Sequence, residues 1–315
     1  MTTATINLQE IIDEQVDPKD EKIAELQAII EDLAPGPLGI YEWDKTGHRG
    51  EPLDLTGYHE TFRDDFDVNS ITVPTGIGPW YSNVHTYFGS AYFRPIGYTP
   101  DPYLVENGEC RIRLELPAGQ TSWQSGIIQT MKANGEGFSQ SMGYFEGRVK
   151  FPLYSQRGFW GGLWLLSAAD FHPEITDHLI EIDINECYTG DYGIHTTVHV
   201  KPRRVPQPGD YPERVGKALY TNPQTCIVSA TGAKQYPASN NIFDGQYHTY
   251  GIMIDEDFVT AYYDGLSIGR FPFLEYFRTP MYFIINSTLY GPQKANAVSP
   301  MDMSIDYVRV MAKTT

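Results

Sequence analysis

The chain has 315 residues, with 23 Lys and Arg against 40 Asp and Glu and a formal net charge of -17. Its 41% hydrophobic content and its length suit a folded protein with a sizeable core. The negative charge argues against nucleic acid or an anionic membrane as a partner, because both are bound through clustered Lys and Arg. No apolar run approaches the roughly 20 residues that a transmembrane helix needs.

The first 34 residues are predicted to form an acidic helical arm. Residues 1–34 contain nine acidic and two basic side chains, so they hold -7 of the net charge. Asp17 followed by Pro18 marks the start of a helix. The apolar residues of this helix occupy the a and d positions of two heptads: Ile23, Leu26, Ile30 and Leu33. This stripe either packs on its own domain or serves self-association or docking into a larger particle, and the sequence leaves both open.

Residues 35–60 are rich in Gly and Pro and are predicted to be a linker or a loosely packed lead-in. From residue 61 to residue 315 the pattern changes to short alternating segments, which indicate strands. The clearest of them span 111–116, 144–151, 181–187, 194–200, 248–255, 259–265 and 304–312. Four turn signals separate strands: Asn107-Gly108, Asn134-Gly135, Asp244-Gly245 and Asp264-Gly265. Because strands do not alternate with helices, we expect an all-β sandwich of two antiparallel sheets.

The cysteines and the N-terminus indicate neither cross-links nor export. Cys110, Cys187 and Cys226 lie far apart in no ligand-like spacing, so neither a disulfide framework nor a zinc site is predicted. The N-terminal segment has no basic region followed by an apolar stretch, so no secretory signal is expected. If the protein acts outside a cell, it leaves by another route.

Three carboxylates fall close together in one predicted strand. In a regular strand Glu181 and Asp183 share a face, and a single bulge at Ile184-Asn185 adds Glu186 to it. Acids on one face repel each other, so a purely structural strand gains nothing from them. They suit hydrolysis of a glycosidic bond, in which one carboxylate attacks the anomeric carbon and a second protonates the leaving oxygen. A solvated acidic strand edge is the alternative.

An aromatic segment at 158–166 precedes the acids by about 20 residues and alternates large aromatic with small side chains. Sugar rings present axial C–H bonds to aromatic faces, so Trp beside paired acids suits a glycan cleft. Trp160 is expected to stack on a sugar. For Trp164, core packing and a ligand contact are both open.

The run Glu-Ile-Asp-Ile-Asn-Glu at 181–186 resembles the Glu-x-Asp-x-x-Glu signature of glycoside hydrolase family 16, in the bulged form of laminarinases, agarases and carrageenases. Other segments agree in order over about residues 61–312: 125–126, 143–152, 158–166, 193–200, 248–265 and 305–310. The resemblance implies a concanavalin-like β-jelly-roll and a retaining endo-glycosidase that needs no catalytic cofactor.

The resemblance also implies roles for single residues. Glu181 would be the nucleophile, Asp183 the assisting acid, and Glu186 the general acid/base. The polysaccharide substrate could be a β-glucan, a galactan, or a bacterial exopolysaccharide or capsule. The low Lys and Arg count disfavours heavily sulfated or uronate-rich glycans.

Four residues are candidates for substrate contacts. Trp160 matches the first Trp of the family's Trp-Pro-Ala-x-Trp segment, although Gly161-Gly162 replace Pro-Ala here. Trp164 ends that segment. His199 matches a His that often reaches the cleft, and His195 on the same strand is either a substrate contact or a structural histidine.

Many family members hold a structural calcium ion, and the matching positions here are Asp306 and Gly108. Asp65 is a candidate third ligand, because a hard cation prefers oxygen donors.

Two other functions stay open. One is a non-catalytic carbohydrate-binding sandwich. The other is a virion or appendage component that carries a polysaccharide depolymerase domain, with residues 1–34 as the docking segment.

Overall fold

The computed structural model describes residues 50–314 except 83–86, 89, 173–177, 190–192, 203–218, 222–226, 229–233 and 236–241. The predicted arm at 1–34, most of the predicted lead-in, and Cys226 lie outside the described residues. In the described part of the chain, no helix has the length and apolar character needed to span a membrane.

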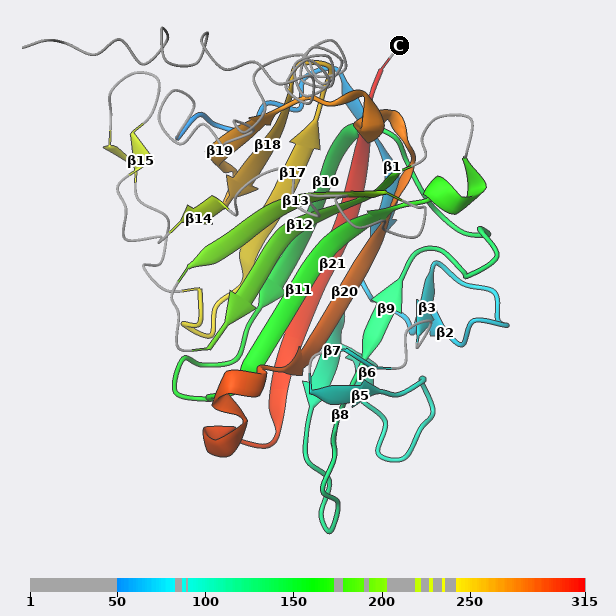
Figure 1. Cartoon of the computed structure of the whole chain (residues 1–315), viewed down its shortest axis with the longest axis vertical. Helices are drawn as coiled ribbons and strands as arrows, with labels where there is room; N and C mark the ends of the chain where they lie inside the picture. Colours follow the sequence, from blue (N-terminus) through cyan, green and yellow to red (C-terminus); the bar gives the residue numbers. More distant parts are fainter. Residues whose placement is uncertain are drawn as a thin grey trace, which may run out of the picture. The chain divides into compact units, whose positions relative to one another are not determined.

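Two large β-sheets lie face to face, with β11, β12, β13 and β20 in front of β10, β17 and β21 in the view of Figure 1. The first sheet has the order β19-β18-β17-β10-β21-β7-β6, and β1 also pairs with β21. Its strands are β1 (Tyr58–Asp64), β6 (Tyr103–Glu106), β7 (Glu109–Leu114), β10 (Gly143–Lys150), β17 (His248–Ile254), β18 (Phe258–Tyr263), β19 (Leu266–Pro272) and β21 (Met301–Lys313).

The second sheet has the order β14-β13-β12-β11-β20-β9-β3-β2. Its strands are β2 (Ile71–Thr72), β3 (Trp80–Ser82), β9 (Ile127–Gln129), β11 (Phe159–Ser167), β12 (His178–Tyr188), β13 (Ile194–Pro202), β14 (Leu219–Thr221) and β20 (Met281–Leu289). The remaining elements are β4 (Tyr87–Phe88), β5 (Ala91–Phe93), β8 (Trp123–Ser125), β15 (Ile227–Val228), β16 (Lys234–Gln235), η1 (Ala169–Phe171), η2 (Glu275–Arg278) and η3 (Gly291–Asn296).

All seven strands predicted from alternation are confirmed, within three residues at each end. In β7 the buried residues are Cys110, Ile112 and Leu114, as the two-residue period requires. Among the described strands only β2–β3 and β5–β8 pair in parallel. The structure is therefore the predicted antiparallel sandwich with two short parallel additions.

Two of the predicted turns close tight hairpins. Asn107 and Gly108 join β6 to β7 with φ values of 56° and 71°, and Asp264 and Gly265 join β18 to β19 with 47° and 72°. Positive φ at both central residues is the type I′ geometry that matches the twist of paired strands.

The core lies between the two sheets. Phe159 of β11 contacts Phe151 at 6.0 Å between ring centroids, and Phe151 contacts Tyr250 of β17 at 5.4 Å. Both described cysteines, Cys110 and Cys187, are buried. Aromatic rings thus join one sheet to the other behind the strand that carries the acids.

The described end of the predicted lead-in is part of the sandwich. The N–H of Gly50 donates to the carbonyl of Ser267, and that of Leu53 donates to Gly265. Strand β1 begins at Tyr58, ahead of the expected boundary at 61. The contacts to β19 are made by the backbone, which requires no alternating side-chain pattern, so the sequence does not reveal them.

Candidate active site

Strand β12 carries the predicted bulge at Ile184-Asn185. Both residues stand opposite the single residue Thr196 of β13. The Thr196 hydroxyl donates a hydrogen bond to the Ile184 carbonyl at 2.9 Å, which gives the bulged carbonyl a partner. The bulge brings three carboxylates to one face of the second sheet: Glu181, Asp183 and Glu186.

Asp183 is the buried centre of these acids, with only 5% of its surface exposed. Its Oδ2 lies 3.1 Å from Nε2 of His199, which is also 3.7 Å from Oε1 of Glu181. Burial raises the pKa of Asp183 to about 7, the His199 hydrogen bond opposes this, and the charges of Glu186 and Glu181 add to it. Asp183 can therefore hold a proton beside a neighbouring carboxylate at neutral pH.

Glu186 is held by two aromatic side chains. The indole Nε1 of Trp160 donates to Oε1 of Glu186 at 3.2 Å, and the Tyr188 hydroxyl donates to the same oxygen at 3.1 Å. The Tyr188 ring contacts Trp160, Tyr290 and His195 at centroid distances of 5.4, 4.8 and 5.2 Å. Glu186 thus lies at the edge of a half-buried aromatic cluster formed by Trp160, Tyr188 and Tyr290.

Trp164 lies on the same face of β11 but has a different environment. Its Nε1 donates to Oδ1 of Asn286 on β20 at 2.8 Å. It also packs with Leu166 against a buried cluster of Phe93, Ile127, Met131, Ala168, Tyr282 and Ile284. Trp164 therefore packs beside the acids, and its contact with a ligand stays a prediction.

The predicted substrate contacts all lie beside the acids. Trp160 and Trp164 stand opposite β12, and His195 and His199 stand opposite Glu186 and Glu181 on β13. His199 is 8% exposed and contacts the carboxylates themselves, whereas His195 packs edge-on against Tyr188. Their roles toward a sugar stay predictions.

Three residues of the site escaped the sequence analysis: Tyr188, Tyr290 and Asn286. Tyr188 follows Glu186 by two residues, so the strand period alone places it on the same face. Asn286 lies in β20, and Tyr290 directly follows it. The nine residues of β20 are all buried and show no alternation. A polar Asn inside such an apolar run is the signal that could have identified Asn286.

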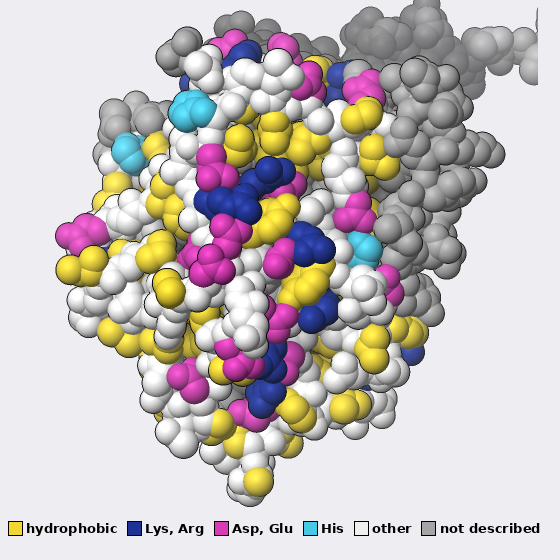
Figure 2. Space-filling model, turned by 180° about the vertical axis from the view of Figure 1, so that it is seen from behind, with side chains coloured by type: hydrophobic (Ala, Val, Ile, Leu, Met, Phe, Trp, Pro, Cys, Tyr) yellow, Lys and Arg dark blue, Asp and Glu magenta, His cyan; other side chains and the backbone are white. Residues whose placement is uncertain are grey.

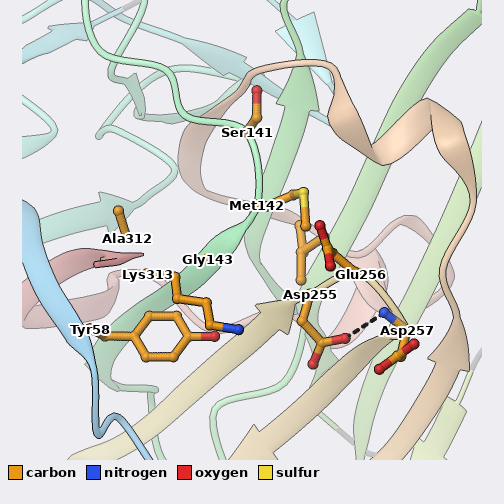
Figure 3. Close-up of a pocket in the computed structure, with 10 residues that line it drawn as sticks. Tyr58, Ser141, Met142, Gly143, Asp255, Glu256, Asp257, Ala312 and Lys313 are labelled. Atoms are coloured by element: carbon orange, nitrogen blue, oxygen red, sulfur yellow. Dashed lines mark hydrogen bonds between the residues drawn. The ribbon is translucent and has the colours of Figure 1, made fainter. Parts of the chain in front are cut away.

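A concavity lies at one end of the first sheet, away from the three carboxylates. It has a volume of about 470 Å³ and includes Tyr58, Lys313 and three consecutive acids at 255–257 (Figure 3). Oδ1 of Asp255 accepts the backbone N–H groups of Asp257 and Phe258 at 2.8 and 2.7 Å. The Asp255 carboxylate therefore stabilises the β17–β18 turn.

Of the predicted calcium ligands, Asp306 lies in β21, Gly108 in the β6–β7 turn and Asp65 directly after β1. Basic and acidic side chains are interspersed on the back of the molecule (Figure 2). Asp306 pairs with Arg148, and Asp65 accepts two hydrogen bonds from Arg63. A Cβ on Gly108 would lie 3.8 Å from the backbone oxygen of Asp65. Gly108 and Asp65 are thus close together. The carboxylates of Asp65 and Asp306, however, already bind the guanidinium groups of Arg63 and Arg148. This donor set fits a cation poorly, and calcium binding stays a prediction.

Comparison with known proteins identifies endo-glycanases as relatives, although no protein-family profile matches the chain. The chain is 25% identical over 234 residues to the endo-1,3-1,4-beta-glycanase EglC of Rhizobium meliloti (strain 1021), which covers 73% of this chain and 42% of EglC. It is 24% identical over 221 residues to ExsH of the same organism, which covers 66% of this chain and 39% of ExsH. The chain thus spans about two fifths of the length of these curated relatives.

Solved structures share the fold. SCLam, a non-specific endo-beta-1,3(4)-glucanase from family GH16, superposes with a TM-score of 0.60 at 22% identity, over 86% of this chain and 97% of that chain. The laminarinase from Flavobacterium sp. UMI-01 superposes with a TM-score of 0.59 at 18% identity, over 81% and 100% of the two chains. Fold and sequence together confirm the resemblance to glycoside hydrolase family 16, and the chain has the β-jelly-roll sandwich of that family.

Proposed function

We propose that the chain is a retaining endo-glycosidase that hydrolyses internal β-glycosidic bonds of a polysaccharide. The observation that carries this proposal is the β12 bulge, which aligns Glu181, Asp183 and Glu186 on one face. The printed activity of the relatives, endo-1,3-1,4-beta-glycanase, supports it.

In the proposed reaction, a carboxylate oxygen of Glu181 attacks the anomeric carbon. Glu186 donates its proton to the glycosidic oxygen, and that oxygen leaves with the electron pair of the broken bond. Glu186 then removes a proton from a water molecule that displaces Glu181 from the sugar. Two displacements restore the β-configuration.

Asp183 and His199 would organise the nucleophile. Asp183 holds a proton at neutral pH when its pKa is about 7, and a protonated Asp183 lowers the charge repulsion beside Glu181. His199 contacts both carboxylates and fixes their side chains. We expect neither residue to bond covalently to the sugar.

A neutral β-glucan with β-1,3 or mixed β-1,3-1,4 linkages is the favoured substrate. The names of the curated relatives and of the structural neighbour SCLam support this choice. The net charge of -17 also fits a neutral substrate, because an anionic glycan would be repelled at long range. Galactans and bacterial exopolysaccharides are the other members of the test panel.

The Glu181→Gln variant tests this function on a polysaccharide panel scored by release of reducing ends. We expect the wild-type chain to cleave a β-glucan and the variant to lose at least about 10³-fold in kcat, with fold and glucan binding retained. Glu256→Gln, in the exposed turn after β17, is the matched control and should keep full activity. Full activity of Glu181→Gln would disprove the mechanism, and NMR of the first product would show β-anomer if the configuration is retained.

A further inference from the structure

The hydrogen bonds at Glu186 are unequal between its two oxygens. Oε1 accepts both the Trp160 indole N–H at 3.2 Å and the Tyr188 hydroxyl at 3.1 Å. Trp160 and Tyr188 face each other across β11 and β12, so the sheet itself places both donors on one side of the carboxyl group.

Two donors on one oxygen determine where a carboxylic acid carries its proton. The carbonyl oxygen of the acid has two lone pairs, and the two donors at Glu186 occupy both. An indole N–H can only donate, and a phenol that donates to Oε1 requires Oε1 to be unprotonated. The acidic proton of Glu186 therefore resides on Oε2.

The Tyr188 hydroxyl is well suited to this task. Burial and the charge of Glu186 raise its pKa above the ordinary range, so it keeps its proton wherever the enzyme works. Its ring contacts the rings of Trp160 and Tyr290 at centroid distances of 5.4 and 4.8 Å. These contacts limit the positions that the hydroxyl can take.

We propose that Tyr188 is a positioning residue for the general acid of the reaction, an inference that rests on the proposed glycosidase function. Tyr188 keeps the proton of Glu186 on Oε2, from which it passes to the glycosidic oxygen as the bond to the anomeric carbon breaks. The negative charge left on Glu186 is then shared with Oε1, where Tyr188 and Trp160 already donate. These hydrogen bonds strengthen as the charge develops, so they stabilise the transition state more than the ground state.

The test compares two substrates that differ in their need for an acid. A β-glucan alkoxide is a poor leaving group and needs the proton of Glu186, whereas 2,4-dinitrophenolate leaves a gluco-oligosaccharide without one. For Tyr188→Phe, which keeps the ring, we expect kcat/KM to fall about 10- to 100-fold on the glucan. On the dinitrophenyl glycoside it should fall less than about threefold, because acid catalysis contributes little there. Equal losses on both substrates, or an unchanged glucan rate, would overturn the role of Tyr188.

Tyr290→Phe is the matched control, because it removes a hydroxyl from the same ring cluster. Any loss that it causes should be equal on the two substrates, and a split like that of Tyr188→Phe would overturn the assignment. If Tyr188→Phe does not fold by circular dichroism, Trp160→Phe removes the other donor and should show the same larger loss on the glucan. A wild-type chain inactive on every glycan would overturn the proposed function itself, whereas equal losses in an active enzyme overturn only the role of Tyr188.

Discussion

Asp183 is the residue at which catalysis and stability conflict. Its carboxyl group is buried and close to Glu181 and Glu186, and burial raises its pKa to about 7 from an ordinary value of 3.8. An ionised carboxylate at this position is costly, because few groups other than His199 offset the lost hydration. At neutral pH the ionised form of Asp183 therefore lowers the stability of the folded chain. A strand with a purely structural role would have an apolar residue at this position.

The contribution of Asp183 to the free energy of unfolding should therefore fall as pH rises from about 4 to about 7. In this window the folded chain keeps a proton on Asp183 that the unfolded chain has lost, so each increase in pH favours unfolding. Asp183→Asn removes the titration, so its stability relative to the wild type should increase steadily with pH across the window. Urea denaturation of both proteins at pH 4, 5.5 and 7 measures this difference. A difference that stays constant with pH would refute it.

Strand β11 pairs with the acid-bearing strand β12, and its two glycines face opposite sides. A Cβ on Gly161 would lie 2.8 Å from the Phe159 ring and 2.9 Å from Phe151, in the core. A Cβ on Gly162 would lie 2.9 Å from Oδ1 of Asn286, on the face that carries the acids. A Cβ at either position would come too close to its neighbours, which accounts for glycine at both.

Substituting each glycine by alanine should separate stability from activity. Gly161→Ala overpacks the core and should lower the free energy of unfolding by about 1–3 kcal/mol. Gly162→Ala displaces Asn286 from its hydrogen bond with Trp164, so we expect a smaller loss of stability and a larger loss of kcat/KM on glucan. Urea denaturation and kinetics on both variants check this. Wild-type stability in Gly161→Ala would contradict the core contacts.

The sequence predicted strands in which apolar and polar residues alternate and missed β20, in which they do not. Strands such as β7 and β12 alternate, so their ends and even the bulge at Ile184-Asn185 followed from the pattern. Strand β20 is buried on both faces and has no alternation, so it and Asn286 were not found. The contact between Tyr188 and Glu186 depends on side-chain orientation, which no spacing rule specifies.

Across the whole molecule, the charges divide into parts with different uses. Of the net charge of -17, residues 1–34 hold -7, and the remainder includes the acids of the site. On the outer face of the first sheet, Glu146 is 2% exposed and accepts hydrogen bonds from Tyr144, Tyr307 and Arg309. The exposed pairs around it should each contribute only about 0–1 kcal/mol. This face therefore satisfies its acids with protein donors.

The same reasoning predicts how the protein responds to calcium. Asp306 and Asp65 each bind an arginine, so a cation would have to displace Arg148 or Arg63. Because this displacement opposes binding, we expect the same Tm in calcium chloride and in EDTA. A cation that bound only the folded state would be easy to detect, because at 100 times its Kd it would add about 2.7 kcal/mol to the free energy of unfolding. Asp306→Asn should lower Tm slightly and equally in both buffers, because it removes only the Arg148 pair. A rise in Tm with calcium that Asp306→Asn abolishes would instead establish the metal site that the family resemblance implies.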